Sequence, residues 1–421
     1  MLQVLKSSWA LLLGMLLLMV GNGLQGTLLG IRGSIEGFST LEISVVMSAY
    51  FAGFFGGSRL APELIRRVGP VRVFAALGSF ISAALILFPV VAEPWAWTIL
   101  RMVLGFCFSG VYVTAESWLN NSASNENRGQ ALSLYMIVQM LGIVSAQGLL
   151  AFGDPSGFVL FIIPSVLVSI AFAPILLSIS PTPAFAASKP MSLRNLFKVS
   201  PLGCVGQFLL GGVFAAQFGM AAVYGTQVGL SIGEISTLVA TIYIGALLMQ
   251  YPIGWLSDRM DRRVLIMTTA LVAGFAAVAG MAFGSSYTVI LAVAFVVGST
   301  TNPLYSLLIA YTNDFLEPDD MASASGGLIF MNGMGAIAGP VTTGWIMATV
   351  GPGGFWLYIS VLMFLLAVYA AYRMTQRAAP PVEDASAYVG VSQAGSVVAL
   401  EAAQEWAIEA AQDEDLETTD A

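Results

Sequence analysis

The sequence predicts an all-α integral membrane protein of twelve transmembrane helices, arranged as two pseudo-symmetric six-helix bundles. The 421 residues are 57% hydrophobic and only 10% charged, with a mean hydropathy of +0.84, whereas soluble domains are about 45–50% apolar and about 25% charged. Apolar runs of about 20 residues recur along the chain, and each can cross ~30 Å of hydrocarbon as a helix. A shift of 193 residues aligns rare polar residues of the two halves.

The apolar runs are continuous rather than alternating, which favours helices over the strands of a membrane barrel. The first run, Trp9 to Gly30, is too long for the apolar core of a signal peptide, so we expect it to be a retained first helix. The twelve expected helices span residues 8–30, 41–61, 72–92, 97–119, 130–152, 157–179, 202–224, 233–256, 264–284, 287–312, 322–348 and 354–375.

The basic residues predict the orientation. With a cytoplasmic N-terminus, 14 of the 16 Lys and Arg residues lie at cytoplasmic loops or helix ends; Arg32 lies outside and Arg101 lies within a helix. This excess predicts that both termini are cytoplasmic. We expect the chain to be a multi-pass protein of a bacterial inner (plasma) membrane.

The chain divides into an N-terminal bundle (1–180), a basic cytoplasmic loop (181–200), a C-terminal bundle (201–377) and a tail (378–421). The tail carries 10 of the 24 acidic residues and no Lys or Arg. Such a composition favours a solvated, mostly disordered cytoplasmic segment. The alternative is a helix from Ser396 to Gln412 that docks a cytosolic partner.

The repeat is visible in residues that apolar similarity would not align. The 193-residue shift pairs Tyr50 with Tyr243, Arg66 with Arg259, Gly105 with Gly298, Tyr112 with Tyr305, Asn120 with Asn313, Glu126 with Asp319, Gln139 with Asn332, and Gly142 with Gly335. One gap-free offset from the second helix to the fifth indicates two parallel repeats.

Several kinds of chemistry are excluded or not expected. The chain has no histidine, which excludes histidine metal ligands and Ser-His-Asp catalysis, and its two cysteines, Cys107 and Cys204, fall in expected helices. No phosphate-binding loop pattern is present. We therefore expect no enzyme activity, catalytic residue, cofactor, metal or nucleic acid. The expected partners are the lipid bilayer, a small-molecule substrate and protons, and the expected state is a monomer.

The stretch from Gly254 to Arg263 reads G-W-L-S-D-R-M-D-R-R and places five charges in six residues between two apolar runs. It resembles the cytoplasmic signature G-x-L-x-D-R-x-x-R-R of the major facilitator superfamily of secondary transporters. Twelve helices in two repeats joined by a basic loop resemble that superfamily too, and Arg101-x-x-x-Gly105 is similar to its helix-four arginine motif. Residues 115–120 (A-E-S-W-L-N) and 125–129 (N-E-N-R-G) resemble its poorly characterised, bacterial YcaD-like branch.

We expect this stretch to act as a cytoplasmic gate. Gly254 allows close helix approach, and Asp258 can accept hydrogen bonds from a helix N-terminus, each contact being worth about 0.3–2 kcal/mol. The resemblance implies that this helix is the fifth, which begins near Arg128. The alternative is that the arginines only set the topology. The first-half loop is basic but has Ile65 opposite Asp258. The expected gate residues are Gly254, Asp258, Arg259, Asp261, Arg262, Arg263, Arg66, Arg67, Arg72, Glu126 and Arg128.

Two charged residues within the fourth helix are candidates for proton coupling. Glu116 is the acid deepest in an expected helix. Because burying a carboxylate in a membrane is costly, such a residue indicates a functional site. It carries a proton, or it pairs with basic residues of the first-half loop (Arg66, Arg67 or Arg72). Arg101 lines the cavity and modulates a carboxylate or an anionic substrate, or it extends to the outer surface.

Polar residues near mid-membrane are expected to line a central cavity, although membrane amides also join helices. The set is rich in amides and hydroxyls, which suits a neutral, amphipathic or zwitterionic solute. Its members are Asn22, Gln25, Tyr112, Gln139, Gln217, Tyr243, Asn302 and Asn332.

The resemblance implies secondary active transport by rocker-switch alternating access. We expect proton-coupled efflux of a small organic solute, with proton-coupled uptake of a metabolite as the alternative. Gly335-x-x-x-Gly339-Pro340 resembles the Gly-Pro motif that antiporters carry in the fifth helix, where this chain has Gln147 instead of proline. A third hypothesis, of another class, is a transport-inactive scaffold or sensor that acts through the acidic tail.

Overall fold

The computed structural model describes residues 2–122, 128–177, 191–378, 386, 388–393 and 395–406. These residues form helices joined by turns, and no strand occurs among them. Eleven helices are long and apolar enough to cross a membrane, and α6 contributes a shorter apolar helix, Val159–Ala173. The expected all-helical membrane architecture is confirmed, and the count of twelve spans stays a prediction.

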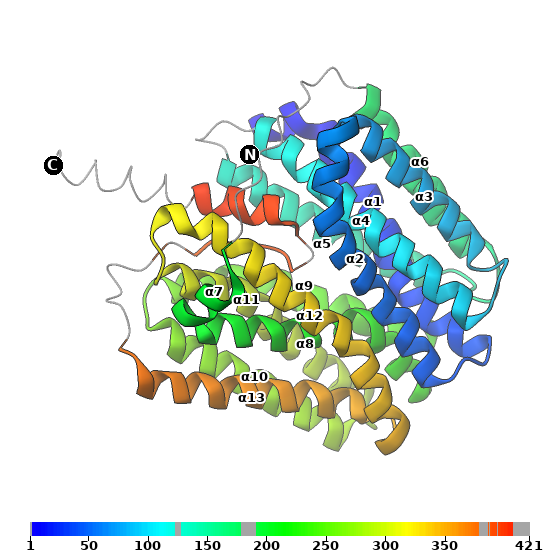
Figure 1. The fold of residues 1–421 in the computed structure, drawn as a ribbon. Helices are drawn as coiled ribbons and strands as arrows, with labels where there is room; N and C mark the ends of the chain where they lie inside the picture. Colours follow the sequence, from blue (N-terminus) through cyan, green and yellow to red (C-terminus); the bar gives the residue numbers. More distant parts are fainter. Residues whose placement is uncertain are drawn as a thin grey trace.

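Six helices form the first half and six form the second (Figure 1). The first half comprises α1 (Leu2–Ile35), α2 (Thr40–Val68), α3 (Pro70–Leu87), α4 (Pro94–Ser122), α5 (Arg128–Ala151) and α6 (Val159–Leu177). The short α7 (Leu193–Val199) lies between the halves in the sequence. The second half comprises α8 (Pro201–Gln227), α9 (Ile232–Ser257), α10 (Arg262–Phe283), α11 (Tyr287–Asn313), α12 (Pro318–Val350) and α13 (Gly354–Gln376). A further helix covers residues 397–406.

The two halves pack their helices in equivalent pairs. In the first half α1 packs on α5, α2 on α4 and α3 on α6; in the second α8 packs on α12, α9 on α11 and α10 on α13. Glycines allow two of these helix pairs to approach closely, because they carry no side chain at the crossing. A Cβ on Gly105 would lie 1.9 Å from the Tyr50 carbonyl oxygen, and one on Gly298 would lie 2.1 Å from that of Ile242. The 193-residue shift that aligns Gly105 with Gly298 therefore also relates two helix crossings.

The halves meet directly at the end of the molecule where the α1–α2 and α12–α13 turns lie, which we call the turn end. There Gln227 donates to the Thr40 hydroxyl at 2.7 Å, and the Ser48 hydroxyl donates to the Ile337 carbonyl. A Cβ on Gly344 would lie 2.3 Å from that of Ser44, so α12 and α2 touch closely. Direct helix packing closes the space between the halves at this end.

The other end, which holds Arg66, Arg259, Arg262 and Arg377, is called the basic end. Here residues 386, 388–393 and 395–406, called the C-terminal segment, lie against both halves (Figure 1, orange to red). Part of the tail that was expected to be solvated is thus packed into the protein, because Val391, Leu400 and Ala403 bury an apolar face. Its helix falls within the alternative Ser396–Gln412 range. Glu126 and residues 181–190 of the central loop lie outside the described residues.

Candidate substrate cavity and gate

A cavity lies between the two halves and is lined by residues of α1, α2, α4 and α5 from one side and α8, α9, α11 and α12 from the other. Three pairs related by the 193-residue shift face it from opposite halves: Tyr50 and Tyr243, Tyr112 and Tyr305, and Gln139 and Asn332. The repeat therefore lines the cavity with the same kinds of side chain on both sides, an aromatic hydroxyl and an amide.

Six of the eight expected cavity residues lie in the lining: Asn22, Tyr112, Gln139, Tyr243, Asn302 and Asn332. The side chains of the other two, Gln25 and Gln217, point into the bundle to which each belongs. Gln25 donates to the Asn22 side chain at 3.0 Å, and Gln217 donates to the Thr301 hydroxyl at 3.0 Å. Gln25 and Gln217 therefore join buried polar groups rather than line the cavity.

The amides of the lining differ in how fully their hydrogen bonds are made. Asn22 donates to the Tyr112 hydroxyl at 2.8 Å and accepts from the Tyr50 hydroxyl at 3.2 Å. Asn332 donates to the carbonyl oxygen of Gln207 at 3.2 Å. Gln139, which is 2% exposed, makes no well-formed side-chain hydrogen bond among the described residues, although its amide lies beside the Tyr135 hydroxyl. An unpaired buried amide is costly, so Gln139 is the group best placed to bind a solute.

Aromatic rings cover much of the remaining lining. Tyr50, Phe51 and Phe218 form a cluster in which Tyr50 lies 5.4 Å from Phe51 and 5.6 Å from Phe218 between ring centroids. None of the described residues that line the cavity carries a formal charge. About 60 Å³ is open to the centres of water-sized molecules, where one water needs roughly 10–15 Å³. The cavity therefore suits a compact, neutral solute with a flat face and hydrogen-bonding edges.

Arg101 lies behind this lining and is completely buried. Its guanidinium donates to the Gln25 side chain and stacks 4.8 Å from the centroid of the Tyr50 ring. Of the two alternatives, extension to the outer surface does not occur, because these contacts replace water around the cation. Among the described residues, Arg101 contacts the lining at Tyr50 and is linked to Asn22 through Gln25, so it positions lining residues rather than lining the cavity.

Glu116 of α4 is buried at the basic end, close to the cavity. Its carboxylate accepts a hydrogen bond from the Tyr135 hydroxyl at 3.0 Å, and it accepts from both the backbone N–H, at 3.0 Å, and the hydroxyl of Ser396. The expected pairing with Arg66 or Arg67 is not the arrangement found. Those two side chains are exposed and each contacts Glu63, at 2.6 Å, one turn back on α2. Arg72 is exposed at the start of α3.

The Gly254–Arg263 stretch forms the α9–α10 connection at the basic end. Asp258 ends α9, and its carboxylate accepts from the backbone N–H of Tyr388 at 3.0 Å and from Arg262 at 3.3 Å. A Cβ on Gly254 would lie 2.6 Å from the Tyr388 ring. We expected Asp258 to hold the start of α5 and Gly254 to admit a helix. The C-terminal segment occupies both places instead.

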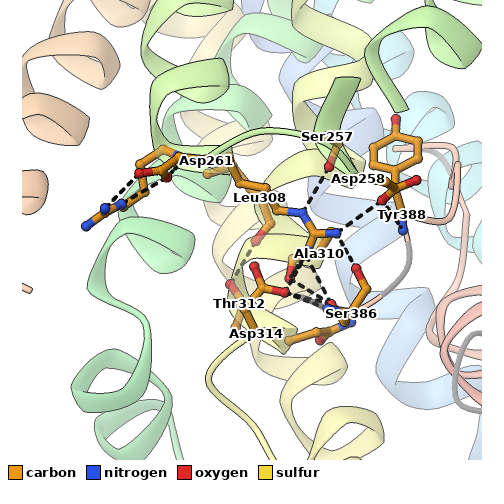
Figure 2. A network of polar contacts seen from close by, with 12 residues as sticks. Ser257, Asp258, Asp261, Leu308, Ala310, Thr312, Asp314, Ser386 and Tyr388 are labelled. Carbon is orange, nitrogen blue, oxygen red and sulfur yellow. Dashed lines mark hydrogen bonds and ion pairs between the residues drawn. The ribbon is translucent and has the colours of Figure 1, made fainter. Parts of the chain in front are cut away.

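Arg262 is the centre of this connection and is 4% exposed. It donates to the Ser257 hydroxyl at 2.9 Å and the Ala310 carbonyl at 3.3 Å, and it forms an ion pair with Asp314. It also donates to the Ser386 carbonyl. Figure 2 shows Ser257, Asp258, Asp314 and Ser386 gathered around this guanidinium. The motif therefore joins α9, α10 and α11 to the C-terminal segment.

The other charged residues of the stretch make contacts within the α9–α10 turn, and Arg263 also donates to the Arg377 carbonyl that follows α13. Asp261 begins α10 by accepting from the Arg263 backbone N–H at 2.9 Å, and it pairs with the Arg263 side chain at 2.7 Å. The Arg259 guanidinium lies 4.3 Å from the centroid of the Trp255 ring. Arg128 is the first residue of α5. These contacts fix the α9–α10 turn but do not reach the other half.

Two residues that sequence reasoning missed are central to this end. The carboxylate of Asp314 is 5% exposed and accepts from the Ser386 backbone N–H at 3.0 Å and hydroxyl at 2.9 Å. Burial raises the pKa of Tyr388, which keeps its hydroxyl protonated while Gln250 donates to it at 2.8 Å. The sequence signal that could have identified Asp314 is an acidic residue at the end of an apolar run. No comparable signal in the tail sequence points to Tyr388.

Comparisons with known proteins agree with this architecture. A family model described as Major Facilitator Superfamily matches residues 11–231 and 203–399. The chain is 24% identical over 357 residues to an uncharacterized MFS-type transporter, YcaD, of Escherichia fergusonii, covering 84% of this chain and 92% of that protein. It is 25% identical over 361 residues to the uncharacterized MFS-type transporter YfkF of Bacillus subtilis, covering 83% and 91%.

Solved structures share the fold at low identity. The crystal structure of a point mutant of the nucleoside transporter NupG superposes with a TM-score of 0.74 at 16% identity, covering 87% of this chain and 99% of that one. A second structure of NupG gives a TM-score of 0.69 at 15% identity, covering 89% and 99%.

Proposed function

The chain belongs to the Major Facilitator Superfamily of membrane transporters, and from this premise we propose that it moves a small neutral solute by rocker-switch alternating access. The cavity is the substrate site. Following the distribution of basic residues, we place the protein in a bacterial inner membrane with the basic end and both termini in the cytoplasm. It works as a monomer, because each chain brings its own two halves around one cavity.

The observation that carries the proposal is the composition of the lining: facing aromatic rings, the unpaired amide of Gln139 and no formal charge. Aromatic faces bind flat rings by offset stacking, and an amide offers both a donor and an acceptor to a polar ring edge. We propose a neutral compound with a flat heteroaromatic ring as the substrate class. A nucleoside transporter with this fold makes nucleosides the first solutes to test.

A binding screen on purified protein tests this class. Neutral nucleosides and nucleobases should raise the melting temperature, whereas the corresponding nucleotides should not, because the lining offers no cation to a phosphate. A ligand at 100 times its Kd stabilises by about 2.7 kcal/mol. Gln139→Leu keeps the side-chain size and should abolish that shift. Gln376→Leu, on the exposed end of α13, is the matched control. Stabilisation by nucleotides alone would contradict the proposed class.

Proton coupling is the proposed energy source, with Glu116 as the carrier. Glu116 is 2% exposed, and it lies at the basic end close to the cavity. Buried carboxylates within membrane helices are typical of proton relays. We propose efflux as the direction, with uptake as the alternative. In inside-out vesicles under an imposed pH gradient, efflux predicts accumulation of the solute and uptake predicts its loss.

A further inference from the structure

The C-terminal segment occupies the space between the halves at the basic end. Ser392, Gln393 and Gly395 belong to the lining of the central cavity, so the segment reaches the proposed substrate site itself. Ser396, Leu400, Ala402 and Gln404 of the segment are each at most 3% exposed. A segment buried to this degree has its own docking site in the body.

The second half binds the extended part of the segment through its backbone. The N–H groups of Ser386, Tyr388 and Val391 donate to Asp314, Asp258 and the Ser306 hydroxyl, at 3.0, 3.0 and 2.9 Å. Buried backbone donors outside regular structure need such partners. Side chains of α9 and α11 thus replace the hydrogen bonds that the extended peptide would otherwise make with water.

The first half binds the helical part. Glu116 accepts two hydrogen bonds from Ser396, directly before the helix at residues 397–406. A carboxylate at this place compensates the positive end of a helix. At the other end of that helix, the Trp406 ring lies 2.5 Å from where a Cβ on Gly129 would stand, so only glycine at the start of α5 admits it. The segment therefore contacts both halves through different groups.

We infer that the C-terminal segment is an intramolecular gate, which docks between the halves and closes the cavity towards the basic end. At the turn end the halves close the cavity by direct contact; at the basic end a removable peptide does so. Opening towards the basic end requires the segment to leave Glu116, Asp258 and Asp314 together. The inference rests on the proposed function only in taking the cavity to be the substrate site.

Labelling of a single cysteine in the cavity tests the gate without any solute. In a background with Cys107→Ala and Cys204→Ala, Met140→Cys places the reporter in the cavity lining. A charged maleimide reacts with it in purified full-length protein. Asp258→Asn and Ser396→Ala, which each weaken a charge-assisted hydrogen bond to or from the segment, should raise the labelling rate about tenfold.

Asp154→Asn is the matched control, since that carboxylate binds only Ser156 among the residues described and lies in the α5–α6 turn. It should leave the labelling rate unchanged. Equal rates in the original protein, Asp258→Asn and Ser396→Ala would overturn the inference. These rates do not depend on nucleoside binding, so the gate and the proposed substrate class fail separately.

Truncation after Arg377 gives a second test with a rescue arm. The truncated protein should label as fast as the fastest point variant, and a synthetic peptide of residues 386–406 should restore slow labelling. A short tether holds its segment at an effective concentration of order mM, so the peptide should act in that range. A scrambled peptide is the control. If the truncated protein melts early or aggregates, the full-length point variants decide the question; slow labelling of a well-folded truncated protein refutes the gate.

Discussion

Removal of Arg262 should destabilise the protein strongly, because it leaves a buried carboxylate without its cation. Arg262 and Asp314 form an ion pair in which the side chains are 3% and 5% exposed. Breaking a buried pair from one side costs about 3–5 kcal/mol, since the remaining charge stays desolvated. Arg262→Met keeps an unbranched apolar stem but removes the cation, and it should therefore lower the free energy of unfolding by about 3–5 kcal/mol. Denaturant titration in detergent measures this change.

Two further variants separate the ion pair from general damage at the helix end. Arg259→Met removes a neighbouring arginine that stacks on Trp255 at the surface, and it should cost no more than about 1 kcal/mol. Adding Asp314→Asn to Arg262→Met removes the unpaired charge and should recover part of the loss. If Arg262→Met unfolds at the same denaturant concentration as the original protein, Arg262 and Asp314 are not a desolvated pair and the reasoning is refuted.

Three other substitutions test the packing, the coupling and the gate. Gly105→Ala should lower stability by about 2 kcal/mol or more, because the new Cβ meets the Tyr50 carbonyl at 1.9 Å; Gly56→Ala, with nothing within 4 Å, is the control, measured by melting temperature. Glu116→Gln should abolish pH-gradient-driven transport while membrane insertion persists, and retained driving would exclude it as the carrier. Asp258→Asn should impair transport in well-inserted protein by weakening its bond to Tyr388; normal transport would exclude a gating role.

The fold and much of the cavity could be predicted because both depend on properties that run along the sequence. Apolar run length determines which segments can span a membrane, and the 193-residue shift relates the Gly105 and Gly298 helix crossings. The depth of a residue in the membrane follows in the same way from its position along an apolar run, so the amides near mid-membrane could be predicted. Rotation about the helix axis is not readable where every face is apolar. Gln217 and Asn332 illustrate this limit, since both lie at suitable depth and only Asn332 faces the cavity.

The gate could not be predicted because its partners come from the least patterned part of the chain. The motif at 254–263 shows which residues are charged, and it predicts correctly that they lie at one end of the bundle. It does not show that Asp258 meets a backbone N–H of Tyr388 rather than the start of α5. The tail looked solvated because its acids dominate its composition. Its described part docks because the acids lie mainly elsewhere, and Val391, Leu400 and Ala403 present an apolar face.

The asymmetry between the two halves follows from this docking. Asp258 has no counterpart in the first half, where Ile65 stands at the equivalent position, yet the segment needs an anionic acceptor on each side. In the first half Glu116, within α4, provides it, and in the second half Asp258 and Asp314 do so at the helix ends. Each set meets N–H donors of one peptide, so at the basic end the segment joins the two halves, in addition to the direct helix contacts at the turn end. Since the segment must leave both sets to open the basic end, loss of either set weakens the docking and should raise the labelling rate of a cysteine in the cavity, and loss of both sets should raise it further.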